Sequence, residues 1–471
     1  MVENILLIRQ IKGRKDLFLA LGLYLLFALI LFSNYKYIIN SDGISYISIA
    51  RNYINGHLFY AINGYWSPLY SWLLIPFISF LPGNLGNIFA TKVFAIIIGL
   101  FTLVAIYLII DKLNFNNFLK SIFLLTIIPY MILFTFNFIT PDLLVVCILL
   151  LYLNFLMDEK YRQNKHMGFF IGFLASIAFL AKSYCFFFLL IHFFLSNLFY
   201  IKKYSQDRSV IKKNLFLGLS VFLVISSVWV GIISEKYDVI TISTSGSYNY
   251  ALVGPESNSN HHVMFYQGLI APPNEFAVSS WEDPSYFQIK KWSPLDSTQN
   301  FIHQIRIIFN NIHDIILFSL LLLFIPILAV FLALFILFKS DDKSIKHNII
   351  FILGTMVLYT GGYILILVED RYLWFVLILS FILGFYSLNL LHLKKYISTN
   401  FFRIAAILIM VSTTFFPIYY LNGDFGVYKN FYDISSDLKS HGIKGNLASN
   451  DQWETMDYYS YYLDSKYLWC Y

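Results

Sequence analysis

The chain has 471 residues, of which 58% are hydrophobic, 19% aromatic and only 13% charged, with a mean hydropathy of +0.66. Soluble globular domains carry roughly twice that share of charged residues, so the composition excludes a soluble protein and indicates an integral membrane protein. The formal net charge at pH 7 is +6, and we attribute it to basic residues in cytoplasmic loops. We therefore expect no nucleic-acid partner.

Apolar stretches long enough to cross a hydrocarbon core of roughly 30 Å recur along the chain. They predict eleven membrane-spanning helices, at about residues 17–39, 87–110, 119–138, 141–157, 168–182, 184–200, 215–233, 313–338, 348–368, 372–391 and 402–420. The first stretch is too long for a cleaved signal peptide and lacks a small-residue cleavage site, so we expect it to be retained. The predicted fold class is an all-α, polytopic transmembrane helical bundle.

A further apolar stretch, residues 68–81, is short and is predicted to lie in the membrane interface as a helix. With that assignment most of the 33 Lys and Arg fall on the cytoplasmic side together with the N-terminus, as the positive-inside rule requires. The predicted organisation is a transmembrane domain over residues 1–420, with external loops at 40–86 and 234–312, and an external C-terminal tail over residues 421–471. The tail is small for an independent domain, so we expect it to pack on the membrane-embedded part.

Five charged side chains lie at or near the predicted exterior ends of spans: Asp42, Asp142, Lys182, Glu369 and Arg371. Charges at such depths are costly and usually face a polar cavity or one another, so their convergence on one side of the membrane predicts a functional site. Each also has a structural interpretation. The two aspartates suit helix N-termini, the lysine could extend to the interface, and the last two residues could form a surface turn.

Two adjacent histidines, His261 and His262, lie in the long external loop. A metal site needs ligands that converge on one point, whereas adjacent side chains point in different directions in most backbones. No third ligand at a recognisable spacing accompanies this pair. A solvated loop is therefore the favoured interpretation, and the sequence predicts no metal site there.

The residues that carry chemistry follow a recognisable order along the chain. The order is Asp42, Tyr46 and Ala50 after the first span, Gly56, the stretch with Trp66, Pro68, Leu69 and Tyr70, Thr140-Pro141-Asp142, the span from Gly168 and Gly172 to Ala181-Lys182, and Arg371-Tyr372. This order resembles the GT-C superfamily of integral-membrane glycosyltransferases, near the protein O-mannosyltransferases and the lipid A aminoarabinose transferase. The resemblance covers residues 17–200 well and residues 348–391 weakly.

The resemblance implies a function and a set of site residues. Members of the superfamily take a sugar from a polyprenyl-phosphate carrier and pass it to a lipid, glycan or protein acceptor on the outer face of the membrane. Their catalytic aspartate corresponds to Asp42, their second acidic motif to Asp142, and the lysine that ends their glycine-rich span to Lys182. Many relatives have two adjacent acids where this chain has Asp42-Gly43, which argues against a metal-binding role for this loop. No cofactor is expected to be required, and a divalent cation remains open.

A transfer of this kind assigns a role to each charged group. The carrier phosphate needs cations, and Lys182 and Arg371 would supply a point charge and a bidentate fork. The acceptor hydroxyl needs a base within hydrogen-bond reach, which Asp42 would supply, while Asp142 would orient the acceptor or hold Lys182. A single displacement would invert the anomeric configuration. The residues expected to bind substrate are Tyr46, Arg51, Trp66, Tyr70, Glu369 and Tyr372.

The predicted location is the plasma (inner) membrane, with the site facing the exterior or periplasm and with membrane lipids as further partners. Two other classes stay open. A lipid or solute transporter would place its ionisable groups near the bilayer midplane and carry broken helices. A non-catalytic envelope-assembly protein would not need a lysine and an arginine opposite two aspartates. The position of Asp42 relative to Asp142 discriminates, because an enzyme would place both around one polar cavity.

Overall fold

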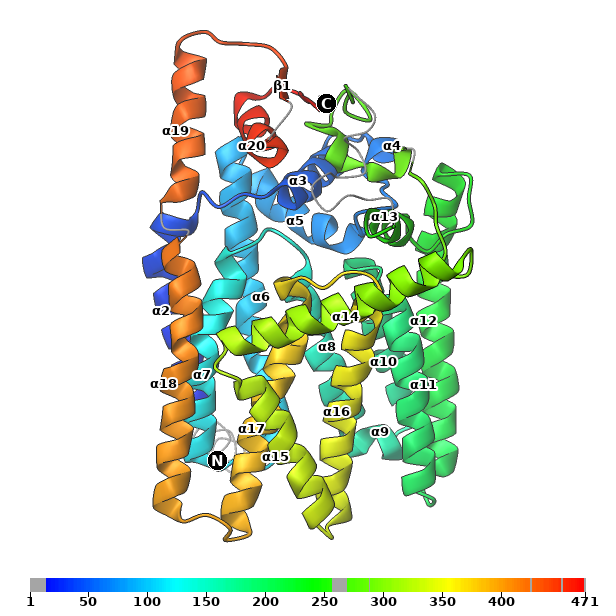
Figure 1. Cartoon of the computed structure of the whole chain (residues 1–471), viewed down its shortest axis with the longest axis vertical. Coiled ribbons are helices and arrows are strands. Elements are labelled where there is room, and N and C mark those ends of the chain that lie inside the picture. Colours follow the sequence, from blue (N-terminus) through cyan, green and yellow to red (C-terminus); the bar gives the residue numbers. More distant parts are fainter. Residues whose placement is uncertain (1–13, 256–268, 288, 424–425, 450–451, 470–471) are drawn as a thin grey trace, which may run out of the picture.

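The computed structural model describes residues 14–255, 269–287, 289–423, 426–449 and 452–469, and these residues form a bundle of helices (Figure 1). The helices of the bundle are α2 (Lys15–Tyr35), α6 (Asn84–Lys112), α7 (Asn117–Phe136), α8 (Asp142–Leu156), α10 (Met167–Ala181), α11 (Cys185–Lys203), α12 (Arg208–Lys236), α15 (Ile325–Lys339), α16 (Lys343–Ile364), α17 (Trp374–Leu393) and α18 (Thr399–Gly423). The short helix α9 (Glu159–Gln163) joins α8 to α10. His261 and His262 lie outside the described residues.

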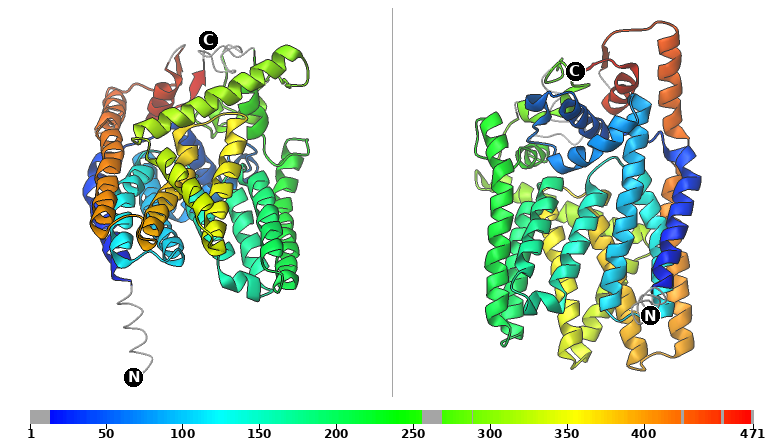
Figure 2. Two further views of the ribbon diagram at one scale, coloured as in Figure 1. Left: turned by 60° about the horizontal axis from the view of Figure 1, so that its bottom comes forward. Right: turned by 180° about the vertical axis from the view of Figure 1, so that it is seen from behind.

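Helices of the structure coincide with ten of the eleven predicted spans. Eight are long and apolar enough to cross a membrane, namely α2, α6, α7, α11, α12, α16, α17 and α18. α8 and α10 are apolar but only 15 residues long, and α15 passes the same test together with the helix before it, as a bent pair. Successive helices of the bundle run in alternating directions (Figures 1 and 2). The prediction of an all-α polytopic membrane bundle is confirmed.

One predicted span is wrong. Residues 313–338 do not form a continuous helix, because α14 (Thr298–Leu321) and α15 meet at an angle of 100°. Leu323 and Phe324 adopt positive φ angles of 53° and 58° at the bend. Pro326 follows them in the first turn of α15, where its missing N–H costs nothing, but it cannot continue a helix from α14. α14 consequently lies across the upper part of the bundle rather than within it (Figure 1).

Glycines bring two helices of the bundle into backbone contact. A Cβ built on Gly168 would lie 2.3 Å from the carbonyl oxygen of Asn214, and one on Gly172 would lie 2.3 Å from that of Gly218. Small residues four apart allow membrane helices to approach this closely. α10 is therefore held against α12 along its length, which fixes the depth at which α10 ends and Lys182 begins.

Shorter elements gather at the upper end of the bundle (Figure 1). They are α3 (Ser41–Ile54), α4 (Leu58–Ala61), α5 (Pro68–Phe80), α13 (Ser245–Leu252), η2 (Ser280–Glu282), η3 (Pro284–Tyr286), η4 (Asp370–Leu373), α19 (Val427–Ser440), β1 (Leu447–Ser449), α20 (Trp453–Leu463) and β2 (Tyr467–Trp469). β1 and β2 pair in parallel, and α20 packs on α3 and α6. With 13 residues, α5 is about 20 Å long, too short to span the membrane. The candidate site lies where this group of elements meets the helices of the bundle.

Candidate functional site

Asp42 lies in the first turn of α3, close to the segment that leads into α8. Two features fix this approach. Asn40 Oδ1 accepts a hydrogen bond from Ile139 N at 2.9 Å, and a Cβ built on Gly43 would lie only 2.5 Å from the Cβ of Ile139. Only glycine fits there without displacement. Gly43, which stands where many relatives have a second acid, therefore allows the segments that carry Asp42 and Asp142 to come into contact.

Both carboxylate oxygens of Asp42 accept hydrogen bonds from side chains that are distant in sequence. Arg371 Nη1 donates to Oδ2 at 2.6 Å, and Trp281 Nε1 donates to Oδ1 at 2.9 Å. A helix cap would instead accept from amides of its own first turn. The arrangement therefore argues against a capping role for Asp42.

Arg371 lies in η4, just before α17, and gathers carboxylates around its guanidinium. Besides the bond to Asp42, its Nε donates to Glu369 Oε2 at 2.7 Å and lies 4.0 Å from Asp142 Oδ2. The side chain of Arg371 is 14% exposed and that of Asp142 is 6% exposed. At such burial an unpaired charge is costly, so the arginine and the acids stabilise one another.

Lys182, the residue after α10, completes the chain of ion pairs. Its Nζ donates to Asp142 Oδ1 at 2.5 Å and lies 3.8 Å from the centroid of the Tyr372 ring, within cation–π distance. Thr140 Oγ1 donates to Asp142 Oδ2 at 2.7 Å. The lysine thus points into the protein rather than toward the interface. Asp142 sits between two cations.

The aromatic candidates lie around α3. Tyr46 packs edge-on against Trp66 and Tyr70, with ring centroids 5.2 Å apart in each case. Burial and then the charges of Asp42 and Asp142 raise the pKa of Tyr46 above its ordinary value. Trp66 is buried and donates its Nε1 hydrogen to the carbonyl oxygen of Trp281 at 3.2 Å.

Arg51 is not brought into this cluster. Its Nη2 donates to Asn84 Oδ1 at 2.6 Å and to Tyr461 OH at 3.3 Å, and its guanidinium lies over the Tyr461 ring. Tyr461 OH in turn donates to the carbonyl oxygen of Asn84 at 3.0 Å. Arg51 therefore joins α3 and α6 to α20 of the tail.

The structure adds residues that sequence reasoning missed. Trp281 contacts Asp42 directly, and its neighbour Glu282 is buried, with a pKa raised by burial to about 8. Asp457 of α20 is fully buried, and burial raises its pKa to about 7. Burial and then the charge of Asp42 raise the pKa of Glu454, in the first turn of α20. An aromatic residue beside two acids, as in Trp281-Glu282-Asp283, was a signal that the external loop offered.

A cavity of about 260 Å³ adjoins Arg371. Its walls are mostly apolar and come from α7, α14, α17 and α18, and its charged lining residues are Glu369, Asp370 and Arg371. The lining residues are Leu133, Phe134, Asn137, Phe138, Phe318, Glu369, Asp370, Arg371, Trp374, Phe416 and Tyr420. Arg371 therefore stands between this cavity and Asp42.

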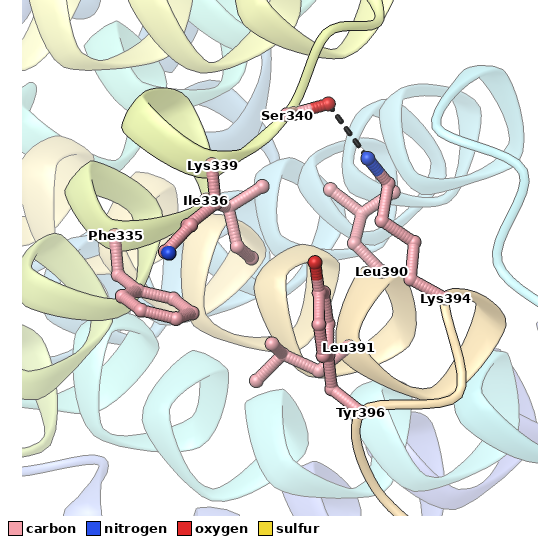
Figure 3. A pocket seen from close by; sticks show the side chains of 8 residues that line it. All are labelled: Phe335, Ile336, Lys339, Ser340, Leu390, Leu391, Lys394 and Tyr396. Atoms are coloured by element: carbon pink, nitrogen blue, oxygen red, sulfur yellow. Dashed lines mark hydrogen bonds between the residues drawn. The ribbon is translucent and has the colours of Figure 1, made fainter.

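A second pocket lies at the opposite end of the bundle, between α15 and α17 (Figure 3). Lys394 Nζ donates to Ser340 Oγ at 2.8 Å across it. Its volume is about 10 Å³, at the lower limit for a single water molecule. We assign no ligand to it.

The site does not have the composition of a resident metal centre. Among the described residues no group of three or more His, Cys, Asp or Glu side chains could hold a metal ion. The two aspartates that could contribute are each bonded to a cationic side chain, Asp42 to Arg371 and Asp142 to Lys182. We therefore derive no step through a metal.

Comparison with solved structures identifies proteins that share this fold. No protein-family model and no curated protein sequence matches the chain. Two crystal structures of ArnT from Cupriavidus metallidurans, one bound to undecaprenyl phosphate and one in the apo state, each match it with a TM-score of 0.53 and 12% sequence identity. Each match covers 95% of this chain and 85% of the ArnT chain. The chain therefore shares the fold of ArnT.

Proposed function

We propose that this protein is a membrane glycosyltransferase that moves a sugar from a polyprenyl-phosphate carrier to an acceptor hydroxyl at the outer face of the membrane. One observation carries the proposal: Arg371, which lines a mostly apolar cavity, donates a hydrogen bond to Asp42. The transfer needs a base for the acceptor and positive charge for the departing phosphate, and this pair supplies both. The fold agrees, because ArnT, which shares it, has been crystallised with undecaprenyl phosphate.

The cavity beside Arg371 suits the head of the donor. Its volume of about 260 Å³ is below the roughly 300 Å³ at which ordinary ligand pockets begin, so it cannot enclose a whole polyprenyl chain. We infer that the phosphate and the first isoprene units enter this cavity, while the rest of the chain lies in the surrounding lipid. Arg371 would then bind the phosphate from the side that faces Asp42.

The ion pair between Arg371 and Asp42 requires the donor to bind before the proton is transferred. In the structure Arg371 Nη1 donates a hydrogen bond to Oδ2 of Asp42, the oxygen that would take the acceptor's proton. A donor phosphate competes for the guanidinium and releases Oδ2. The acceptor hydroxyl then gives its proton to Asp42 as its oxygen attacks the anomeric carbon, and the bond from that carbon to the phosphate oxygen breaks. A single displacement inverts the configuration, and the polyprenyl phosphate leaves with both electrons of the broken bond.

Lys182 and Asp142 support the phosphate-binding side. Asp142 accepts from Lys182 at 2.5 Å and lies 4.0 Å from Arg371, so it holds the two cations on one side of the site. We propose that Asp142 keeps them in place until the donor arrives. Tyr372, which lies under the lysine ammonium, would fix its direction.

We further propose that the site faces the exterior or periplasm of a plasma (inner) membrane. The charged groups gather where several helices end at the upper side of the bundle, the side that holds the tail, rather than midway along them (Figure 1). A transporter would need ionisable groups near the midplane. The bend between α14 and α15 does not supply that feature, because neither Leu323 nor Phe324 at the bend is ionisable.

The test is a comparison of cell-envelope lipids and glycans, by intact mass, between cells with and without this protein. We expect one class of envelope molecule to lose a single sugar mass when the protein is absent. Purified protein in lipid should restore that mass when it is given the matching polyprenyl-phosphate sugar. Identical envelopes, together with no transfer from any polyprenyl-phosphate sugar tried, would contradict the proposal.

A further inference from the structure

Asp42 has a partner that the proposed reaction has not used. Trp281 Nε1 donates to Oδ1 of Asp42 at 2.9 Å, from a segment of the external loop 239 residues later in the chain. The indole nitrogen can only donate, so it can neither take the proton of the acceptor nor bind the phosphate as a cation would. The hydrogen bond therefore acts on the reaction through the carboxylate of Asp42.

The indole is held firmly. The backbone carbonyl oxygen of Trp281 accepts a hydrogen bond from Trp66 Nε1 at 3.2 Å. Its ring lies 5.6 Å from that of Tyr65 and 5.6 Å from that of Trp453 in the tail, with 8% of the residue exposed. A side chain packed on several sides has little rotamer freedom, so its N–H has a fixed direction.

The residue after Trp281 ties the same segment to the first external loop. Glu282 Oε1 accepts from Ser48 Oγ at 2.9 Å and from Val278 N at 2.6 Å. The carbonyl oxygen of Glu282 accepts from Asn63 Nδ2 at 2.7 Å. η2 is therefore fastened to α3 and to the segment before α5 within one residue of the indole.

We propose that Trp281 is a positioning residue for Asp42, which selects the oxygen that receives the acceptor's proton. The proposal rests on the proposed function, in which Asp42 is the base. Once the donor phosphate has drawn Arg371 away, Oδ2 is free, while Oδ1 stays bonded to the indole. The bond prevents rotation of the carboxylate and stabilises its ionised form, so that Oδ2 remains directed at the acceptor.

The first test is the kinetics of Trp281→Phe, which keeps an aromatic ring but removes the donor. We expect kcat to fall about tenfold or more, the size of one hydrogen bond to a charged group, with the KM for the polyprenyl donor unchanged. The acidic limb of the pH–rate profile should move to higher pH, because the carboxylate form loses a stabilising bond. Trp292→Phe is the matched control. The indole N–H of Trp292, in the same loop, donates to the backbone carbonyl oxygen of Tyr250 at 2.7 Å, so its loss should leave kcat and KM unchanged.

A second variant covers the case in which Trp281→Phe fails to fold. Benzothienylalanine at position 281 keeps the shape of the indole and replaces its N–H with sulfur, and it should reproduce the same changes. In the Asp42→Asn background, loss of the indole N–H should have little further effect on the rate, because the carboxylate base that it positions has gone. A loss of kcat that is equal at every pH and persists in that background would assign Trp281 a purely structural role and overturn the proposal.

A readout that needs no transferase activity separates this proposal from the proposed function. A carbodiimide with a glycine ester modifies protonated carboxyl groups, and peptide mass analysis reports the extent at Asp42. At a fixed pH near 6 we expect modification of Asp42 to increase severalfold in the benzothienylalanine variant, with Asp142 as the internal reference. Unchanged modification would overturn the positioning role even if the enzyme is active, and increased modification would support it even if no substrate has been found.

Discussion

Gly43→Ala tests whether the two acidic segments must touch for the site to form. The added Cβ would lie 2.5 Å from Ile139 Cβ and 2.9 Å from its Cγ2, whereas carbon atoms in contact rest about 3.5–4.0 Å apart. The segments must therefore separate by about 1 Å, which would strain the 2.6 Å bond between Asp42 and Arg371. Overpacking of this kind costs about 1–3 kcal/mol, and a displacement of about 1 Å in a catalytic group costs about a hundredfold in rate.

The assay is sugar transfer by purified protein in lipid, together with the melting temperature of the same sample. Gly246→Ala is the matched control, because a Cβ there meets no atom within 4 Å. We expect Gly43→Ala to lose about two orders of magnitude in kcat while the control keeps its activity. Wild-type turnover and an unchanged melting temperature in Gly43→Ala would show that the approach of α3 to Ile139 does not position Asp42.

Three further outcomes are expected. Lys182→Met removes a charge at nearly constant side-chain length, so the KM for the polyprenyl donor should rise about tenfold to over a hundredfold; unchanged donor kinetics would remove the lysine from the phosphate site. Burial raises the pKa of Glu282 to about 8 and that of Asp457 to about 7. The packing of α20 should therefore be most stable below about pH 4, where both carboxyl groups are protonated in any environment, and should weaken progressively up to about pH 8. Hydrogen exchange of the α20 amides as a function of pH checks this, and Asp457→Asn should lessen the pH dependence. Ser465→Cys in the tail should react with a membrane-impermeant thiol reagent added to intact cells; reaction only from the cytoplasmic side would overturn the proposed orientation.

The length of apolar stretches predicted the bundle because every membrane span must bury about 20 consecutive residues in hydrocarbon. The same criterion failed for residues 313–338, where apolar residues continue through a bend of 100°. Hydropathy is unaffected by backbone direction, and the signal that did exist was Pro326, whose ring ends a preceding helix. α8 and α10, with only 15 residues each, are shorter than this criterion requires.

The meeting of the five charged side chains could be predicted for a physical reason, because charges at the ends of membrane helices must find partners. The sequence could not say which partner each would find. Arg51 is five residues further along α3 than Tyr46, and its side chain contacts the tail rather than Asp42. Trp281 lies in a loop whose sequence has no periodic pattern. Its contact with Asp42 of α3, 239 residues earlier in the chain, depends on how that loop folds. Such pairings come from tertiary packing, which local patterns do not encode.

The most direct test of the account is sugar transfer by Asp42→Asn, because asparagine keeps the size of the side chain and removes the proton acceptor. Positioned bases contribute about 10²–10⁴-fold to rate, so transfer should fall by that factor while donor binding and the melting temperature persist. Asp342→Asn is the matched control: Asp342 caps α16 by accepting from Ser344 N, and asparagine caps about as well. Near wild-type turnover from normally folded Asp42→Asn protein would contradict the account and leave Asp142 as the next candidate for the base.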